Sequence, residues 1–179
     1  MRDHGIRAWK KVWLQQTMVD FNGKPMISRI LSATDGALFA ARIVVTRSRE
    51  VEAFCRERKI PVLLHAMPYR NHTVHLGLSA LLKEYPELAG CMFALGDQPL
   101  LTRETLEAMV ITFSQYYQTA SPIFRLAAIA EDDSIIPGNP ILFGNRYFEE
   151  LLTLPDNHGG NVLLKKYPDV VWYFPAGNP

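Results

Sequence analysis

The stretch CMFALGDQPLLTRETLEAM, residues 91–109, decides the fold that this sequence predicts. The apolar run 90–95 is typical of a buried strand, and it ends abruptly at the turn GDQP. A helical pattern begins immediately afterwards. Thr102 is a suitable N-cap for this helix because its hydroxyl can accept a backbone hydrogen bond. A buried strand that leads directly into a helix is typical of an α/β protein.

The rest of the chain alternates between strand and helix patterns in the same way. Strands are predicted at 41–47, 61–65, 90–95, 122–130, 140–143 and 170–174, and helices at 23–35, 49–59, 73–84, 103–117, 145–152 and 162–167. An acidic turn is predicted at 131–139. This order predicts a three-layer, Rossmann-like α/β fold in which helices cover both faces of a mostly parallel sheet. No repeat or linker interrupts the pattern, so we expect a single domain over residues 1–179.

Composition is that of a globular protein, with 48% apolar and 21% charged residues. The formal net charge of +1 gives no reason to expect a nucleic-acid partner. The N-terminal MRDHGIRAWKKVWLQQT has no apolar run long enough for a signal peptide or a membrane span, so no membrane contact is expected. Only two cysteines, Cys55 and Cys91, occur, and we therefore expect a reduced, cytoplasmic setting.

Asp97 is the first candidate for a functional residue. It follows the predicted strand directly, and open α/β sheets bind their ligands at the carboxyl ends of parallel strands. A carboxylate in this place can coordinate a hydrated Mg²⁺ ion that bridges substrate phosphates. The alternative is an aspartate that only caps the turn through local hydrogen bonds. The residues alone leave both interpretations open.

Gly138, Asn139 and Pro140 form a second candidate group, directly before the strand at 140–143. Glycine permits a ligand to approach the backbone closely, and the Asn139 amide offers both donors and an acceptor. An ordinary turn that introduces a strand explains the same tripeptide.

Two polar helix entries are further candidates. Arg70, Asn71 and Thr73 belong to the stretch 69–73, which is predicted to lead into a helix. Backbone N–H groups at a helix start attract anions and Arg70 adds charge, although Thr73 is equally an ordinary N-cap. The loop DNHGGN, 156–161, is either a phosphate cradle or a flexible surface turn.

Taken in order, these segments resemble one known family. GKPMISRIL, HLGLSALL, ALGDQPLLTRETL, GNPILF and LPDNHGGNVLLKKYP are similar to segments of the MobA-like NTP transferases, in particular the molybdopterin cytidylyltransferase branch. The resemblance covers residues 18–175 and implies a fold of the nucleotide-diphospho-sugar transferase type. It also implies transfer of CMP or GMP from CTP or GTP to molybdopterin, with release of pyrophosphate.

The same resemblance implies roles for the candidate residues. Asp97 would be the catalytic and metal-binding residue, which holds Mg²⁺ against the nucleotide phosphates. Gly138, Asn139 and Pro140 would shape the substrate side of the cleft, and Arg70, Asn71 and Thr73 would lie near the nucleotide base.

The sequence also departs from the family pattern at both ends. Where members have an apolar first strand and a glycine-rich loop, this chain reads RAWKKVWLQQT, so we expect the first strand to be missing. The acidic segment that follows the last strand in members is also absent from the sequence. A second interpretation is therefore a relative that binds nucleotide or a partner protein without turnover. Unpaired strand edges invite a partner, which makes a homodimer a further expectation.

Overall fold

The strands that the structure describes form two separate sheets. The computed structural model describes residues 18–35 and 38–176. In this part of the chain a parallel sheet has the order β1-β2, and a four-stranded sheet has the order β3-β5-β4-β6. The strands are β1 (Val44–Thr46), β2 (Val62–Leu64), β3 (Gly90–Phe93), β4 (Ile123–Ile129), β5 (Ile135–Gly144) and β6 (Val171–Pro175). The larger sheet is mixed, because β5 runs antiparallel to β3 and β4 whereas β6 runs parallel to β4.

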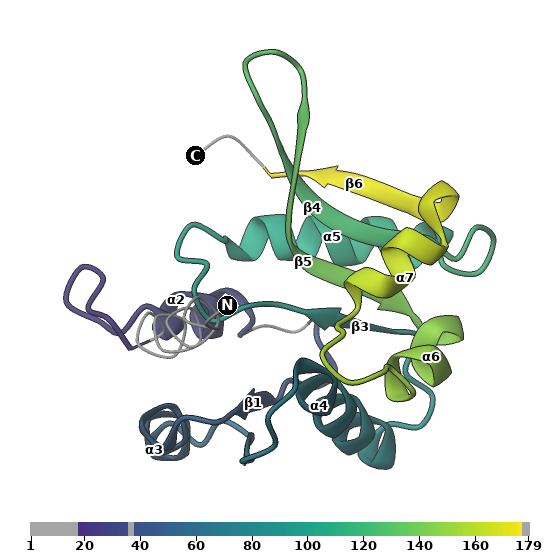
Figure 1. Cartoon of the computed structure of the whole chain (residues 1–179). Helices are drawn as coiled ribbons and strands as arrows, with labels where there is room; N and C mark the ends of the chain where they lie inside the picture. The colour runs from purple at the N-terminus through teal and green to yellow at the C-terminus, as the bar shows by residue number, and fades with distance from the viewer. Residues whose placement is uncertain (1–17, 36–37, 177–179) are drawn as a thin grey trace, which may run out of the picture.

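Helices connect and cover these strands (Figure 1). They are α2 (Ile27–Ala33), α3 (Arg49–Glu57), α4 (Arg70–Glu84), α5 (Arg103–Tyr116), α6 (Phe148–Leu152) and α7 (Asn161–Lys166), with 3-10 turns at Asn145–Tyr147 and Pro168–Val170. The N-cap predicted at Thr102 is confirmed, because its hydroxyl accepts the N–H of Thr105 at 3.2 Å. None of the helices in the described residues is long and apolar enough to cross a membrane.

Helix α4 begins earlier than the sequence indicates. The helix was predicted from residue 73, but it starts at Arg70, with Tyr69 in the N-cap position. Thr73 therefore lies inside the first turn and is not the N-cap. A contact with a distant part of the chain explains the earlier start, because the buried Asn71 side chain donates to the carbonyl of Leu154.

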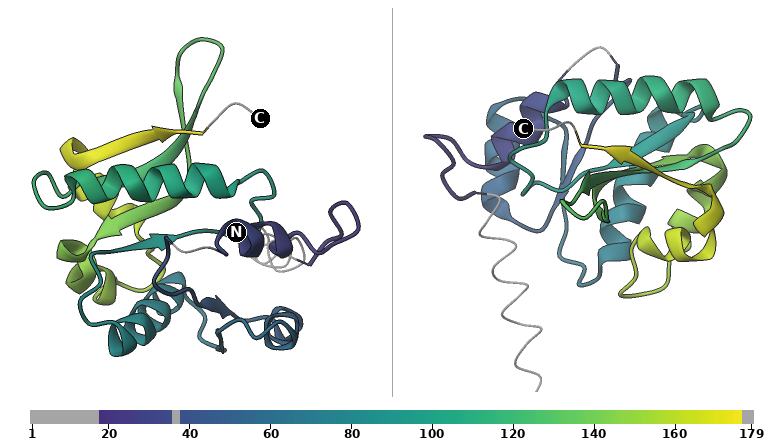
Figure 2. Two further views of the ribbon diagram at one scale, coloured as in Figure 1. Left: turned by 180° about the vertical axis from the view of Figure 1, so that it is seen from behind. Right: turned by 90° about the horizontal axis from the view of Figure 1, so that it is seen from above.

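Different helices cover the two faces of the larger sheet (Figure 2). On one face, Met109 and Phe113 of α5 pack against Leu142 of β5. On the opposite face, Ile141 and Phe143 of β5 pack in the cluster that contains residues of α4, α6 and α7. This alternation along β5 follows from the two-residue period of a strand.

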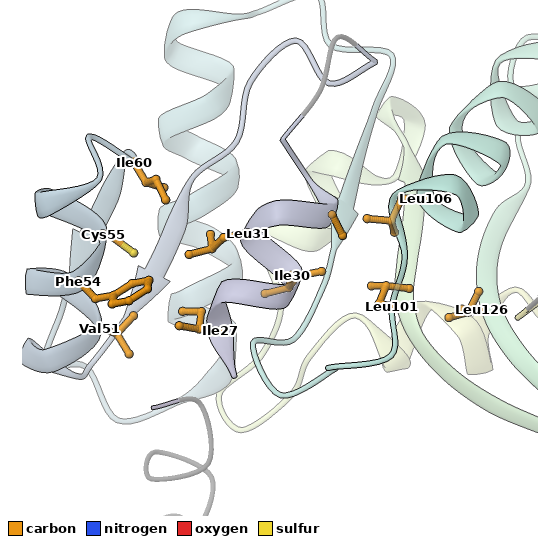
Figure 3. Packing of buried hydrophobic residues seen from close by; sticks show 11 residues of the cluster. Ile27, Ile30, Leu31, Val51, Phe54, Cys55, Ile60, Leu101, Leu106 and Leu126 are labelled. Atoms are coloured by element: carbon orange, nitrogen blue, oxygen red, sulfur yellow. The ribbon is translucent and has the colours of Figure 1, made fainter. Parts of the chain in front are cut away.

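Helix α2 joins the region of the smaller sheet to the start of α5. Figure 3 shows Ile27 and Leu31 of α2 facing Phe54 of α3, whereas Ile30 faces Leu101. All five side chains are buried in one cluster. The α2 helix is therefore held by apolar burial on two sides.

The β4–β5 hairpin extends beyond the sheet (Figure 1). Its turn is closed by two hydrogen bonds at Ser134, whose carbonyl accepts the N–H of Ala130 at 2.9 Å and whose N–H reaches the Asp132 carboxylate at 3.1 Å. The prediction of a turn over 131–139 is wrong for residues 135–139. They belong to β5 instead, because Ile135–Pro137 pair with Ala127–Ile129 across the hairpin.

A cavity of about 850 Å³ lies between the two sheets. Val44 and Val45 of β1 and Cys91 and Met92 of β3 line it, together with residues of α2, α4 and α5. No strand of the described residues lies between β1 and β3. The predicted α/β class with helices on both faces is confirmed, and its sheet is interrupted at the position of this cavity.

Candidate functional site

The Asp97 turn lies at the carboxyl end of β3. The strand ends at Phe93, and the turn at 96–99 leads to α5. The Asp97 side chain is partly buried, and among the described residues none forms an ion pair or a hydrogen bond with its carboxylate. Within these residues the carboxylate therefore does not cap the turn through a hydrogen bond, and its metal-binding role stays a prediction.

Gln98 joins the Asp97 turn to the second candidate group. Its Oε1 accepts the N–H of Leu95 at 3.1 Å, which closes the turn. Its Nε2 donates to the carbonyl of Asn139 at 2.5 Å. The structure therefore brings Gly138, Asn139 and Pro140 next to the turn that carries Asp97, although they are far apart in sequence.

Arg125 supports the same group from the neighbouring strand β4. Its Nε donates to the carbonyl of Gly138 at 3.0 Å. Sequence reasoning missed Gln98 and Arg125, although both left a signal. Gln98 adjoins the candidate aspartate, and Arg125 is the single charge in the apolar run PIFRLAAIA, where a charge needs a partner or a function.

Asn71 connects the start of α4 to the loop before α7. Its side chain is only 9% exposed, and its Nδ2 donates to the carbonyl of Leu154 at 3.2 Å and to Asp156 Oδ1 at 3.1 Å. The carboxylate of Asp156 also lies 3.9 Å from Nε2 of His72. The two polar helix entries that the sequence indicates thus form one cluster.

Thr73 faces β2 rather than the end of its own helix. Its Oγ1 lies 3.1 Å from Nε2 of His65, which follows β2. Burial lowers the pKa of His65, and the nearby side chains of Arg47 and His72 lower that pKa further. The neutral imidazole is therefore favoured here. In this form one ring nitrogen donates a hydrogen bond and the other accepts one.

This second cluster has unused hydrogen-bonding capacity. His65 Nδ1, Asn71 Oδ1 and His72 Nδ1 are buried and have no hydrogen-bond partner within the described ranges. Buried polar atoms of this kind are normally satisfied, so these three atoms are an exception within the described residues. Arg70 lies at the exposed first position of the same helix.

The two clusters remain separate in the contacts that the structure describes. No hydrogen bond or ion pair between residues 18–35 and 38–176 joins the Asp97 turn to the start of α4. The predicted residues thus fall into a group around Asp97 and Asn139 and a group around Asn71 and Thr73. A ligand that uses both groups has to bridge them.

The donor set around Asp97 fits one kind of metal site. In the described part of the chain no group of three or more His, Cys, Asp or Glu side chains is placed to hold an ion. A complete protein cage of the kind that zinc requires is therefore not present there. Mg²⁺ commonly uses one or two carboxylates and takes its other ligands from phosphates and water, and the partly buried carboxylate of Asp97 meets this requirement.

Neither cysteine is suited to nucleophilic chemistry. Both thiols are free and buried. Burial raises the pKa of Cys91 to about 12 and also raises the pKa of Cys55, although the cations Arg58 and Arg42 oppose the latter shift. The thiolate that a nucleophile requires is thus disfavoured at both positions.

Comparison with known proteins identifies the family. The model of the MobA-like NTP transferase domain matches residues 15–170, and this chain therefore belongs to that family.

Two curated proteins named 3-deoxy-manno-octulosonate cytidylyltransferase are similar. The protein of Polynucleobacter asymbioticus is 27% identical over 128 residues, 72% of this chain and 50% of its own length. The protein of Polynucleobacter necessarius is 25% identical over 126 residues, 70% of this chain and 48% of its own length. The chain thus spans about half the length of the curated relatives that it matches.

Solved structures confirm the fold. Rv0371c of Mycobacterium tuberculosis aligns with a TM-score of 0.72 at 18% identity, over 90% of this chain and 79% of that one. A CMP:2-keto-3-deoxy-manno-octonic acid synthetase in complex with CTP aligns with a TM-score of 0.68 at 12% identity, over 92% and 85% of the two chains. At these identities the likeness establishes the fold alone, which is the nucleotide-diphospho-sugar transferase type that the sequence resemblance implies.

Proposed function

We propose that this chain is a nucleotidyltransferase that moves CMP from CTP to a small acceptor and releases pyrophosphate. The observation that carries the proposal is the Gln98 bridge, which holds the turn that carries Asp97 against the backbone of Asn139. Transfer at phosphorus requires positioned groups and cations against the developing charge more than it requires acid–base residues. A single carboxylate beside a rigid backbone segment meets this requirement.

Each cluster has a role in this proposal. Asp97 would hold a Mg²⁺ ion, which neutralises phosphate charge when it is bound. Gly138, Asn139 and Pro140 form the acceptor side, held in place by Gln98 and Arg125. Arg70, Asn71 and Thr73 lie on the nucleotide side, where the exposed Arg70 at the start of α4 can contact the nucleotide.

The acceptor and the base are the finer parts of the proposal. The family resemblance favours molybdopterin as acceptor and admits GTP in place of CTP. The curated relatives, which are named for 3-deoxy-manno-octulosonate, favour CTP and a sugar acid. We place the sugar acid first, because the identity of 25–27% extends over about 70% of this chain.

Pyrophosphate release tests the activity. The purified chain is incubated with CTP or GTP, with Mg²⁺ or Mn²⁺, and with either 3-deoxy-manno-octulosonate or molybdopterin. We expect release with CTP and the sugar acid, and a loss of about 100-fold or more in Asp97→Asn, which keeps the shape but removes the charge. Asp169→Asn, at an exposed aspartate in a 3-10 turn, is the matched control and should leave the rate unchanged. No release under any combination would reject the proposed transfer.

Nucleotide binding without turnover is a second candidate function. It is favoured by the small donor set at Asp97, because no group of three or more His, Cys, Asp or Glu side chains in the described residues is placed to hold an ion. Calorimetric titration with CTP, with and without Mg²⁺, separates the two candidates. Metal-dependent binding that Asp97→Asn weakens, together with no pyrophosphate release, would support this second function over transfer.

A further inference from the structure

Arg125 places a positive charge within an otherwise apolar part of the larger sheet. It lies on β4, which has β5 on one side and β6 on the other (Figure 1). Arg125 is partly buried. The two residues on each side of it along the chain are buried: Ile123, Phe124, Leu126 and Ala127. A charge in such a place is costly unless it has a partner of opposite charge.

The described part of the chain satisfies this guanidinium only in part. Its Nε donates to the carbonyl of Gly138 at 3.0 Å. Among residues 18–35 and 38–176, none forms an ion pair with Arg125. The N–H groups of Nη1 and Nη2 have no hydrogen-bond partner there either. The edge that these two groups form matches the two oxygens of a carboxylate.

The register of the strands places Arg125 on the face of the sheet that is opposite to α5. Arg125 is paired with Ile141 of β5 and with Tyr173 of β6, and paired residues of neighbouring strands point to the same face. Ile141 belongs to the cluster that contains residues of α4, α6 and α7. Phe124, the preceding residue of β4, points the other way and contacts the ring of Phe113 on α5.

Tyr173 shows that the helices leave this part of the face open. It is 45% exposed, although it lies on the same face as the buried Ile141. Among the described residues its hydroxyl has no hydrogen-bond partner. A tyrosine hydroxyl can donate a hydrogen bond. Arg125 and Tyr173 therefore offer a cation and a neutral donor on neighbouring strands.

Arg125 is also level with the end of β3. Ile141 is paired with Arg125 on one side and with Phe93, the last residue of β3, on the other. The strands β3, β4 and β6 all run in the same direction, because β5 is antiparallel to β3 and β4 and because β6 is parallel to β4. Their carboxyl ends thus share the edge at which open α/β sheets bind ligands.

The backbone of Gly138 and Asn139 connects Arg125 to the Asp97 turn. Arg125 bonds to the carbonyl of Gly138, and Gln98, the neighbour of Asp97, bonds to the carbonyl of Asn139. The segment assigned above to the acceptor side therefore lies between the Asp97 turn and the guanidinium. An acceptor that contacts this segment has Arg125 within reach.

We propose that Arg125 binds a carboxylate of the acceptor through its two Nη groups, and that the Tyr173 hydroxyl donates to the same carboxylate. The acceptor is accordingly a small organic acid, and its carboxylate is a recognition group distinct from the oxygen that attacks the nucleotide. This inference rests on the proposed transfer function and specifies the acceptor class and the residues that select it.

The charges at this place favour a carboxylate over a phosphate. A guanidinium carries one positive charge, which balances the single negative charge of a carboxylate. A phosphate monoester carries nearly two negative charges at neutral pH. The residues paired with Arg125 are Ile141 and Tyr173, and neither supplies a second cation.

A matched pair of ligands tests the role of the carboxylate on the parent protein. Calorimetric titration of the full chain uses 3-deoxy-manno-octulosonate as one probe and its methyl ester, which removes the negative charge, as the other. We expect the acid to bind about 30-fold more tightly than the ester, because the ester loses a charge-assisted, bidentate contact. This comparison requires neither turnover nor a variant that folds.

Substitutions then identify the residues that bind the acid. Arg125→Gln should weaken binding of the acid about 30-fold and leave binding of the ester unchanged. Arg125→Lys should recover part of the loss, because lysine keeps the charge without the planar pair of donors. Tyr173→Phe should weaken binding of the acid about threefold. Arg49→Gln, at an exposed arginine of α3, is the matched control and should bind the acid as the parent does.

Kinetics separate recognition of the acid from a merely structural role of Arg125. In the pyrophosphate assay, Arg125→Gln should raise KM for the acid about 30-fold and leave KM for CTP unchanged, with kcat changed less than about threefold. If Arg125 only held the backbone of Gly138 in place, the substitution would instead lower kcat or raise both KM values. That result would overturn the proposal.

The binding and turnover results have separate meanings. No binding of the acid, equal binding of acid and ester, or unchanged binding of the acid in Arg125→Gln would each overturn the proposed carboxylate site. Titration with inorganic phosphate is the further control, and a loss of phosphate binding in Arg125→Gln without a loss of acid binding would also overturn it. Arg125-dependent binding of the acid without pyrophosphate release would support the carboxylate site and reject the proposed transfer.

Discussion

The four-stranded sheet and the two-stranded sheet differ in how well neighbouring elements enclose them. In the larger sheet β5 has a partner on each edge and helices on each face, and Phe143 near its C-terminal end is only 1% exposed. In the smaller sheet β1 has one partner, and Val44 and Val45 remain partly exposed beside the cavity. The sequence of β1, VVT, is more typical of a strand than the GCMF of β3. The degree of burial in this protein therefore depends on the neighbours of a strand more than on its intrinsic preference.

Replacing a large side chain in each region should give the largest change in the free energy of unfolding. Phe143→Ala removes a fully enclosed ring, so we expect the free energy of unfolding to fall by about 3–5 kcal/mol. Met92→Ala, beside the cavity, should cost less than about 2 kcal/mol, because this side chain is only partly buried and has fewer contacts to lose. Urea unfolding of the two variants measures the difference. Equal losses would show that the region beside the cavity is as tightly packed as the larger sheet.

Filling the cavity should change the free energy of unfolding by a smaller amount and in the opposite direction. Ala94 lines the end of the cavity after β3. Ala94→Ile adds apolar surface that packs against the lining, and we expect the free energy of unfolding to rise by about 0.5–1 kcal/mol. Ala128→Ile places the same side chain on the exposed hairpin and should give no comparable gain in the same urea assay. A loss of stability in Ala94→Ile would mean that this end of the cavity is already closed.

The protonation of His65, which follows β2, should give the smallest change in the free energy of unfolding. The pKa of His65 is lowered in the folded state by burial and by Arg47 and His72, so the unfolded chain takes up this proton first as the pH falls. Stability contributed by the neutral ring is complete above the ordinary histidine pKa of about 6.5 and is lost as the pH falls through the lower folded-state pKa.

Parallel unfolding series between pH 7.5 and pH 5 measure this loss. His65→Gln should reduce the pH dependence slightly, whereas His75→Gln, at an exposed position on α4, should not. If His65→Gln leaves the pH dependence of the free energy of unfolding unchanged, His65 does not contribute to that dependence.

Local patterns predicted the elements around Asp97 well. The apolar run, the turn and the Thr102 cap act within a few residues of one another, so periodicity and capping rules identify them. The same rules placed the start of α4 three residues too late, because the contact of Asn71 with Leu154 lies outside any local window. The turn over 131–139 was overextended for the same reason, since the pairing of residues 135–137 depends on β4.

The sequence by itself determined the α/β class, the family and the position of a carboxylate at the end of β3, because each of these depends on short-range patterns or on ordered motifs. Only the tertiary structure decided how the candidate residues are grouped. Gln98 and Asn139 are 41 positions apart, and Asn71 and Asp156 are 85 positions apart. The tertiary structure also decided where the sheet is interrupted, because unpaired strand edges are defined by which strands become neighbours. Such contacts depend on chain packing over long separations, and hydrophobic periodicity does not encode them.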